Sequence, residues 1–268
     1  MKLFRRKKYL KPIKLSEKGR ILSFCITHQN RFSFLKKTLA KNLEDNRSLK
    51  DKIEFVLVDF SLDENVCSWI WNDFSEEIRE GYLKFYQTNQ LRKWSAPIAK
   101  NTSHKLANGE ILTNLDCDNY VGANGAEFVI DQFKKANEAI ILWQYSGIKY
   151  DGSFGRISIP SKVFKELGGY DESLLEMGWQ DNDLMRRSKA MGLKLVKISD
   201  RKFNQAIAHE KYKPESMSFE QMNKLNEKHA RRKIRKGQLV ANAGNFGIAN
   251  GMLKMNAEGK MKPTIASL

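Results

Sequence analysis

Four short apolar runs, each ending in polar residues, constrain the fold more than any other feature of the sequence. They are "ILSFCIT" (residues 21–27), "IEFVLVDFS" (53–61), "LKFYQT" (83–88) and "EILTNLD" (110–116). Their length and composition predict buried strands. The intervening stretches have helical character, most clearly where Leu35, Leu39 and Leu43 recur every four residues. This alternation predicts an α/β fold, with a mostly parallel central sheet and helices on both faces.

The second half of the chain has a different texture. Further strands are predicted at 139–147, 155–160 and 193–199, and a helix at 181–192 that Gly192 stops. Residues 237–268 are rich in Gly and Asn and weakly periodic, which predicts loop or tail. The expected organisation is a basic N-terminal segment (1–20), one large domain (21–212) and a basic, loop-rich C-terminal extension (213–268).

The formal net charge is +16, and most of it sits in two short segments. Residues 1–20 contain nine Lys or Arg and one Glu, and residues 228–236 contain six Lys or Arg and no acid. The rest of the chain is close to neutral, so we expect no nucleic-acid-binding face spread over the fold. The segments favour tethering to an anionic membrane surface, with two solvated tails as the alternative.

Targeting and cysteine signals are weak. No apolar run is long enough for a membrane span, and the basic N-terminus lacks the apolar core of a signal peptide. The three cysteines are too few and too irregularly spaced for a disulfide framework, which indicates a reducing compartment. We therefore expect a cytoplasmic protein with peripheral contact at the inner face of the cell membrane.

The predicted strands end in polar residues, and ligands of open α/β sheets bind at that edge. Asp116 and Asp118 follow the fourth strand, where residues two apart face the same way. Two such carboxylates repel unless a cation lies between them, and hard oxygen ligands suit Mg²⁺ or Mn²⁺. A divalent ion bridging a diphosphate would explain the pair. A polar turn is the alternative.

Four blocks in order resemble a GT-A fold glycosyltransferase of the family-2 type: "ILSFCITHQNR", "IEFVLVDFS", "APIAKN…ANGEILTNLDCDN" and "LGGYDESLLEMGWQDNDLMRR". The last block also resembles the C-terminal region of β-1,4-galactosyltransferases. The similarity spans roughly residues 20–212. It implies a Rossmann-like domain that binds a nucleotide-diphospho-sugar, here a UDP-sugar, and transfers the sugar with inversion.

The resemblance also implies roles at the nucleotide end of the site. Asp118 matches the residue in direct contact with the metal, and Asp116 matches the ligand nearer the ribose. Asp59 would accept a hydrogen bond from uracil, but "VDFSLDEN" departs from the family pattern and leaves Ser61 and Asp63 as alternatives, with helix capping as another reading. The other residues expected at the donor are Thr27, Gln29, Asn30, Arg31, Lys100, Asn101 and Arg156; Lys100 and Arg156 have plain surface charge as their alternative.

The block "GWQDNDL" carries the expected chemistry. Asp181 matches the base of inverting transferases, which takes a proton from the acceptor hydroxyl. The family usually has Glu where this chain has Gln180. Locally, Asp181 could instead cap the following helix, with Asp183 paired to Arg187. The sugar and acceptor pocket is expected to include Gly169, Tyr170, Trp179 and Gln180, although a core role for Trp179 stays open.

His209 matches a position that often supplies a further metal ligand, and a neutral imidazole suits Mn²⁺ better than Mg²⁺. The other histidines have no such support. The sequence thus predicts an inverting, metal-dependent glycosyltransferase of the hexosyltransferase type, acting on a glycan or glycolipid acceptor in surface polysaccharide synthesis. A nucleotidyltransferase is the enzymatic alternative, although "ITHQNR" lacks its glycine-rich loop. A non-catalytic basic binding protein on a transferase fold is the other.

Overall fold

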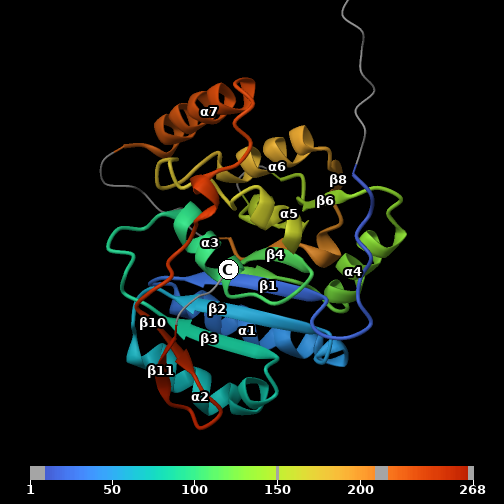
Figure 1. The fold of residues 1–268 in the computed structure, drawn as a ribbon. Coiled ribbons are helices and arrows are strands. Elements are labelled where there is room, and N and C mark those ends of the chain that lie inside the picture. Colours follow the sequence, from blue (N-terminus) through green and yellow to red (C-terminus); the bar gives the residue numbers. More distant parts are fainter. Residues whose placement is uncertain (1–9, 149–150, 209–216, 265–268) are drawn as a thin grey trace, which may run out of the picture.

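The computed structural model describes residues 10–148, 151–208 and 217–264, and a nine-stranded mixed sheet forms its centre (Figure 1). The strand order is β11-β10-β3-β2-β1-β4-β7-β6-β8. The middle of the sheet is parallel, because β1 pairs with β2 and β4, and β2 pairs with β3. The predicted α/β fold is confirmed. The strands are β1 (Leu22–His28), β2 (Ile53–Asp59), β3 (Leu83–Gln87), β4 (Ile111–Asp116), β6 (Ile140–Gln144), β7 (Ile157–Pro160), β8 (Lys194–Ile198), β10 (Met252–Met255) and β11 (Met261–Thr264).

Helices cover both faces of this sheet (Figure 1). One apolar core joins α1 (Phe32–Asp45), α2 (Glu64–Arg79) and α4 (Gly125–Lys135) to the sheet face that carries Phe24 and Ile26. The other joins α3 (Ala96–Lys105), α5 (Ser161–Glu166) and α6 (Gln180–Met191) to the face that carries Cys25. Both faces of β1 are buried, which explains why its sequence is a continuous apolar run.

The prediction of loop or tail for residues 237–268 is wrong for the part that the structure describes. Strand β10 pairs antiparallel with β3 and with β11, so a hairpin extends the sheet. The chain before it is also held, because Gly247 N donates to Glu172 Oε1 (2.6 Å) and Ile248 N to Thr102 Oγ1 (3.0 Å). These strands have four residues each and depend on a distant partner, so no local pattern announces them.

Two helices were not anticipated. The first is α4, in which Val129, Ile130 and Phe133 are buried at helical spacing. The second is α7 (Phe219–Arg235), which contains most of the basic segment 228–236. Ser218 and Gln221 form a capping box at its start, a readable signal for a helix N-terminus. Its buried face is only Met222, Asn226 and Ala230, too polar to stand out in the sequence.

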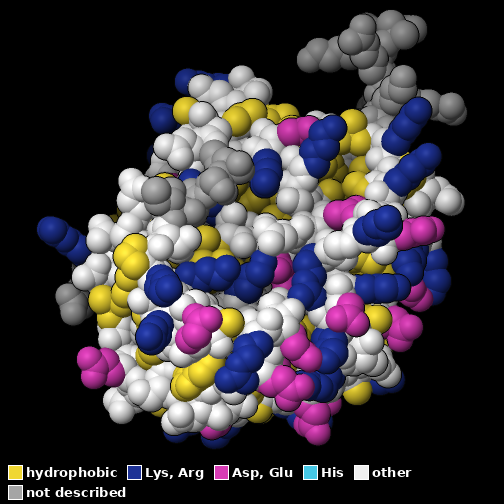
Figure 2. Space-filling view, turned by 60° about the horizontal axis from the view of Figure 1, so that its bottom comes forward, with side chains coloured by type: hydrophobic (Ala, Val, Ile, Leu, Met, Phe, Trp, Pro, Cys, Tyr) yellow, Lys and Arg dark blue, Asp and Glu magenta, His cyan; other side chains and the backbone are white. Residues whose placement is uncertain are grey.

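The surface carries charges of both signs. In Figure 2, Lys and Arg side chains alternate with Asp and Glu over the face in view. Several of them are paired, as in Arg47 with Glu77 (2.5 Å) and Lys41 with Asp45 (2.6 Å). No helix in the described ranges has both the length and the apolar character to cross a membrane.

His104 on α3 is a buried neutral base whose titration should appear in the stability of the fold. Burial lowers its pKa to about 3, against a weaker opposing effect of its hydrogen bond with the Lys100 carbonyl. Because the unfolded chain binds a proton near pH 6.5 and the folded chain does not, stability falls as the pH drops below 6.5. We expect this group to remove about 1.4 kcal/mol per pH unit over that range.

The measurement is urea unfolding between pH 7.5 and 5 for the wild type and His104→Phe. Phe preserves the ring stacked on Phe164, whose centroid lies 4.7 Å away. The variant should lose about one proton's worth of pH dependence, whatever its stability at pH 7.5. An unchanged slope would show that His104 does not titrate in this way.

Candidate active site

The two carboxylates of "DCDN" do not lie on one strand, so that prediction is wrong. Strand β4 ends at Asp116, and Cys117 and Asp118 form a turn that leads into the short strand β5 (Asn119–Tyr120). Thr38 of α1 fixes the turn by donating to the Cys117 carbonyl (2.6 Å). Cys117 itself is buried in the apolar core. The turn reading was therefore right about conformation, and both carboxylates still emerge at the carboxyl edge of the sheet.

Basic groups surround this acidic pair. Arg31, which precedes α1, donates from Nη1 to Asp118 Oδ2 (2.8 Å). Asn114 Nδ2 donates to Asp116 Oδ1 (3.0 Å). Arg156 is fully buried nearby; burial lowers its pKa to about 10, and the charges of Asp116 and Asp118 act against that shift. Arg156 thus remains a cation at neutral pH and supplies fixed positive charge beside the pair.

Lys100 of α3 and Asp181 of α6 form a buried ion pair, with 2.8 Å between Nζ and Oδ1. Burial raises the pKa of Asp181, and Lys100 opposes this only in part. Burial acts to lower the pKa of Lys100, but the charges of Asp181 and Asp116 outweigh it, so the pKa is raised. The helix-cap alternative for Asp181 is wrong: α6 already begins at Gln180, and the Asp181 side chain turns to Lys100.

Asp116 lies close to this ion pair. A Cβ atom built on Gly155 would lie 3.1 Å from Asp116 Oδ2 and 3.1 Å from Lys100 Nζ, so both groups abut the same point of the backbone. Three elements, β4, α3 and α6, therefore bring Asp116, Lys100 and Asp181 together. We call these three residues the acid–lysine cluster. The cluster contains two carboxylates around one lysine.

Asp59 at the end of β2 is enclosed by hydrogen bonds. His28 Nδ1 (2.9 Å), Ser61 Oγ (2.6 Å) and Gln87 Nε2 (3.0 Å) all contact its carboxylate. Burial acts to raise the Asp59 pKa, but these hydrogen bonds outweigh it and lower the pKa. The cap of α2 is Asp63, so the capping role considered for Asp59 is wrong. His28 Nε2 also accepts from Arg31 N (3.1 Å), which ties Asp59 to the loop after β1.

His28 is a residue that sequence reasoning missed. Its position opposite Asp59 comes from the register of β1 on β2, in which the two residues are directly paired. Of the predicted loop residues, Thr27 is paired with Asp116 across β1 and β4, and Arg31 reaches Asp118. Asn30 adopts a left-handed conformation (φ 54°), which turns the chain from strand to helix.

The side chain of Asn101 is hydrogen-bonded to the loop after α5. Its Nδ2 donates to the carbonyl of Tyr170 (2.8 Å) and to Glu172 Oε1 (2.8 Å), and its Oδ1 accepts from Tyr170 N (2.7 Å). Gly169 must be glycine here, because an added Cβ would lie 2.4 Å from Asn101 Oδ1 and φ is 70°. Asn101 therefore positions Tyr170, whose ring centroid lies 5.4 Å from Lys100 Nζ.

Trp179 and Gln180 directly precede Asp181 in the sequence, and their side chains have different surroundings. Gln180 is buried and donates from Nε2 to Asp181 Oδ2 (3.2 Å). Trp179 adopts a strained left-handed conformation (φ 65°), and the guanidinium groups of Arg186 (5.6 Å from the ring centroid) and Arg231 (5.5 Å) lie over its ring. The Trp179 ring thus faces α7. Asp183 pairs with Arg187 (2.6 Å), as expected.

The chemistry of the donor set suits a hard divalent cation. Asp116 and Asp118 supply carboxylate oxygens, and the buried amide oxygens Asn114 Oδ1 and Asn119 Oδ1 have no hydrogen-bond partner among the described residues. His209, the expected nitrogen ligand, lies outside the described residues. Within the described ranges no three His, Cys, Asp or Glu side chains cluster as a metal site, so a bound ion would rest on the two aspartates and oxygen donors around them.

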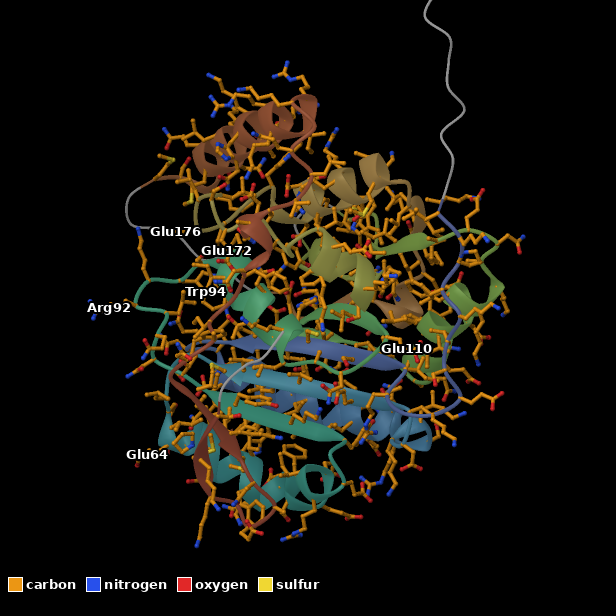
Figure 3. All side chains as sticks on the ribbon, viewed as in Figure 1. Glu64, Arg92, Trp94, Glu110, Glu172 and Glu176 are labelled. Carbon is orange, nitrogen blue, oxygen red and sulfur yellow. The ribbon has the colours of Figure 1, made fainter. Side chains whose placement is uncertain are left out.

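A cavity of about 790 Å³ opens beside this edge of the sheet. Its walls come from the loop after β2, the loop after β3 and the C-terminal hairpin, and include Leu62, Asn89, Gln90, Gly251, Met252 and Thr264. Figure 3 shows Arg92, Trp94, Glu172 and Glu176 toward the same side of the molecule and Glu110 on the opposite side, near the start of β4. A hydrogen bond from Ala96 N to Glu176 O (2.8 Å) joins the start of α3 to the loop between α5 and α6.

Solved structures share this architecture. The crystal structure of S. aureus TarS 1–349 in complex with UDP-GlcNAc aligns with a TM-score of 0.59 and 16% identity, covering 76% of this chain and 65% of that one. A mannosyltransferase from Pyrobaculum calidifontis, in complex with GDP-Man and Mn²⁺, aligns with a TM-score of 0.58 and 15% identity, covering 86% and 68%. The chain has a GT-A fold.

The likeness is one of structure. No protein-family model matches the sequence, and a search of curated proteins finds no match. The chain spans 60% of the length of one aligned TarS 1–349 structure and 65% of the one in complex with UDP-GlcNAc. At such low identity the alignment establishes the GT-A fold, and the activity has to be argued from the side chains of this chain.

Proposed function

We propose that this protein is an inverting, metal-dependent glycosyltransferase that moves a sugar from a UDP-sugar to a hydroxyl group of a glycan or glycolipid. The observation that carries the proposal is the acid–lysine cluster at the carboxyl edge of a GT-A sheet. A buried Lys–Asp pair is costly to maintain compared with an apolar pair of similar volume, which favours a functional reason for it.

Asp116 and Asp118 would hold the divalent cation, with the amide oxygens near them as additional donors. When bound, such an ion neutralises the negative charge that develops on a departing nucleoside diphosphate. Arg156 remains charged within the same region and adds fixed positive potential. The aligned TarS and mannosyltransferase structures contain UDP-GlcNAc and GDP-Man with Mn²⁺, which supports a nucleotide-sugar donor of this kind.

Lys100 connects donor binding to the base. Its ammonium group forms an ion pair with Asp181, with 2.8 Å between Nζ and Oδ1. A diphosphate beside Asp116 would offer Lys100 a second anionic partner and weaken its hold on the Asp181 carboxylate. Asp181 would then accept the proton of the acceptor hydroxyl while that oxygen forms the new bond to the anomeric carbon. The bond to UDP breaks on the opposite side, and its electron pair leaves with the β-phosphate.

Gln180 fits this role of Asp181. Where the resembled enzymes carry Glu, this chain has an amide that donates to Asp181 Oδ2. Its carbonyl oxygen is buried and has no hydrogen-bond partner in the part of the chain that the structure describes, so it is available to an acceptor hydroxyl. We assign Gln180, Gly169 and Tyr170 to the sugar and acceptor side, with Trp179 at its outer margin because that ring faces α7.

The hydrogen bonds that enclose Asp59 bear on how a nucleoside would bind. Its carboxylate already accepts from His28, Ser61 and Gln87, so we propose that it shapes the nucleoside site through these partners. The cavity walled by Leu62 and Gly251 adjoins Ser61 and Asp63 along the chain and is suited to receive the base. The C-terminal hairpin then contributes one wall of the nucleoside site.

A panel of nucleotides tests the function directly. With Mn²⁺ present, UDP and UDP-sugars should stabilise the protein, by about 2.7 kcal/mol at a ligand concentration of 100 times Kd. Thermal unfolding and calorimetry measure this, with GDP-sugars and nucleoside triphosphates as comparisons. Release of pyrophosphate from a triphosphate would support a nucleotidyltransferase, and failure to bind any of these nucleotides would favour a non-catalytic protein.

A further inference from the structure

The outward side of α7 carries cations that form no ion pair with an acid among the described residues. Figure 1 shows α7 in the outermost layer, beyond α6 and away from the sheet. Four cations repeat every four residues along it, which puts them in one row. We call this row, with Arg235 beside it, the α7 cationic face. Its exposed members are Lys224, Lys228, Arg232, Arg235 and Lys236.

This arrangement works against the helix. Like charges four residues apart destabilise a helix by a few tenths of a kcal/mol per pair. The helix dipole favours cations only in the last turn, so it explains Arg232 and Arg235 but not Lys224 or Lys228. No ion pair joins the five cations to an acid within the described ranges, whereas their neighbours Arg231 and Lys233 are paired with Glu227 and Asp171.

One exposed apolar side chain lies on the same side of the helix, and two others lie near α7. Leu225 is 48% exposed and stands three residues before Lys228 and seven before Arg232, on the same side of the helix. Val240, just beyond α7, is 54% exposed, and Leu175 is 40% exposed. Leu175 is held against the opposite, buried side of α7, since its N donates to Asn226 Oδ1 (2.7 Å). Of the five large hydrophobic side chains that are exposed in the described ranges, these are three.

Cations flanked by aliphatic chains match the surface of an anionic bilayer. Lys and Arg attract anionic headgroups, and Leu and Val can enter the boundary of the acyl chains. Single-stranded nucleic acids instead favour aromatic side chains on which bases stack, and the α7 cationic face has none. We propose that this face, with Leu225, docks the protein on a membrane containing anionic lipid.

Docking at this place would bear on the acceptor, an extension that rests on the proposed function. On the opposite side of α7, Asn226 Nδ2 donates to the carbonyls of Met177 (3.0 Å) and Gly178 (2.8 Å). These residues lead directly into Trp179 and Asp181. A bilayer on the outer side of α7 would therefore lie next to the segment that carries the base, which favours an acceptor anchored in lipid.

Vesicle co-sedimentation tests the docking surface without any nucleotide or catalysis, so its outcome is independent of the enzymatic proposal. The full chain should bind vesicles of phosphatidylcholine with 30 mol% phosphatidylglycerol, and pure phosphatidylcholine far more weakly. The triple variant Lys228→Glu, Arg232→Glu, Arg235→Glu should lower the partition constant by at least about 100-fold, at about fivefold per residue.

The matched control is Lys37→Glu, Lys134→Glu, Lys162→Glu, which changes net charge equally at exposed sites on other elements. It should retain most of the binding, and equal loss in both triple variants would overturn the proposal. Leu225→Ser should weaken vesicle binding several-fold while binding to heparin, a soluble polyanion, stays unchanged. If Leu225→Ser bound both vesicles and heparin as the wild type does, the face would be a general polyanion site, and the membrane assignment would be rejected.

Discussion

Asp181→Asn is expected to lower the kcat of sugar transfer by about 10²–10⁴-fold while donor binding persists, because general-base catalysis contributes rate enhancements of that size. Asn has the same shape but cannot accept the proton of the acceptor hydroxyl. Lys100 would lose its charged partner and remain available to the donor diphosphate. Initial rates with a saturating UDP-sugar, together with UDP affinity by calorimetry, separate the two effects.

Asp131→Asn, a change of the same kind on the outer helix α4, should leave both quantities unchanged; the Asp131 carboxylate pairs only with Lys135 in the described structure. Thermal unfolding of Asp181→Asn checks that the fold survives. Transfer at the wild-type rate in a folded Asp181→Asn protein would move the base to another residue.

Asp118→Asn should abolish the effect of Mn²⁺ on donor affinity and lower kcat/KM by at least about 100-fold. Loss of groups that only support metal ligands already costs 10–100-fold in other enzymes, and Asp118 is assigned to direct contact. The amide cannot replace the carboxylate charge, and Arg31 would lose its anionic partner. Calorimetric titration of UDP with and without Mn²⁺ measures the effect, and hydrolysis of the UDP-sugar reports turnover.

Two results would contradict this assignment. One is turnover that needs no divalent ion in the wild type, and the other is an Mn²⁺ response that survives in Asp118→Asn. Arg31→Gln provides a comparison, since it removes the cation bound to Asp118 and leaves both carboxylates in place. It should retain the Mn²⁺ response, even if donor affinity changes.

Most of the central fold could be predicted because its signals are local. A buried parallel strand needs an apolar run, and the helices between such strands need a repeating apolar stripe, so β1 to β4 and α1 are visible in the sequence. The C-terminal hairpin was missed because its pairing with β3 is a contact between residues 86–87 and 253–254, which no local pattern specifies.

The residues of the site likewise divide into those that could be predicted from the sequence and those that could not. Asp116, Asp118, Asp59 and Asp181 could be nominated from residue type and position, since acids at strand ends or helix starts are unusual enough to notice. The ion pair of Lys100 with Asp181 could not, because it joins residues of α3 and α6 that are 81 positions apart and meet only in the tertiary structure. The same holds for His28, which meets Asp59 only through strand register.

By itself, the sequence determined the α/β alternation, the acids at the edge of the sheet and the uneven placement of positive charge, because each is written in neighbouring residues. Only the tertiary structure decided that Asp59 is enclosed, that Asn101 holds Tyr170, and that the second basic segment is the outer face of a packed helix. Those outcomes depend on which side chains meet across the fold, and burial and pairing then set their charge and availability.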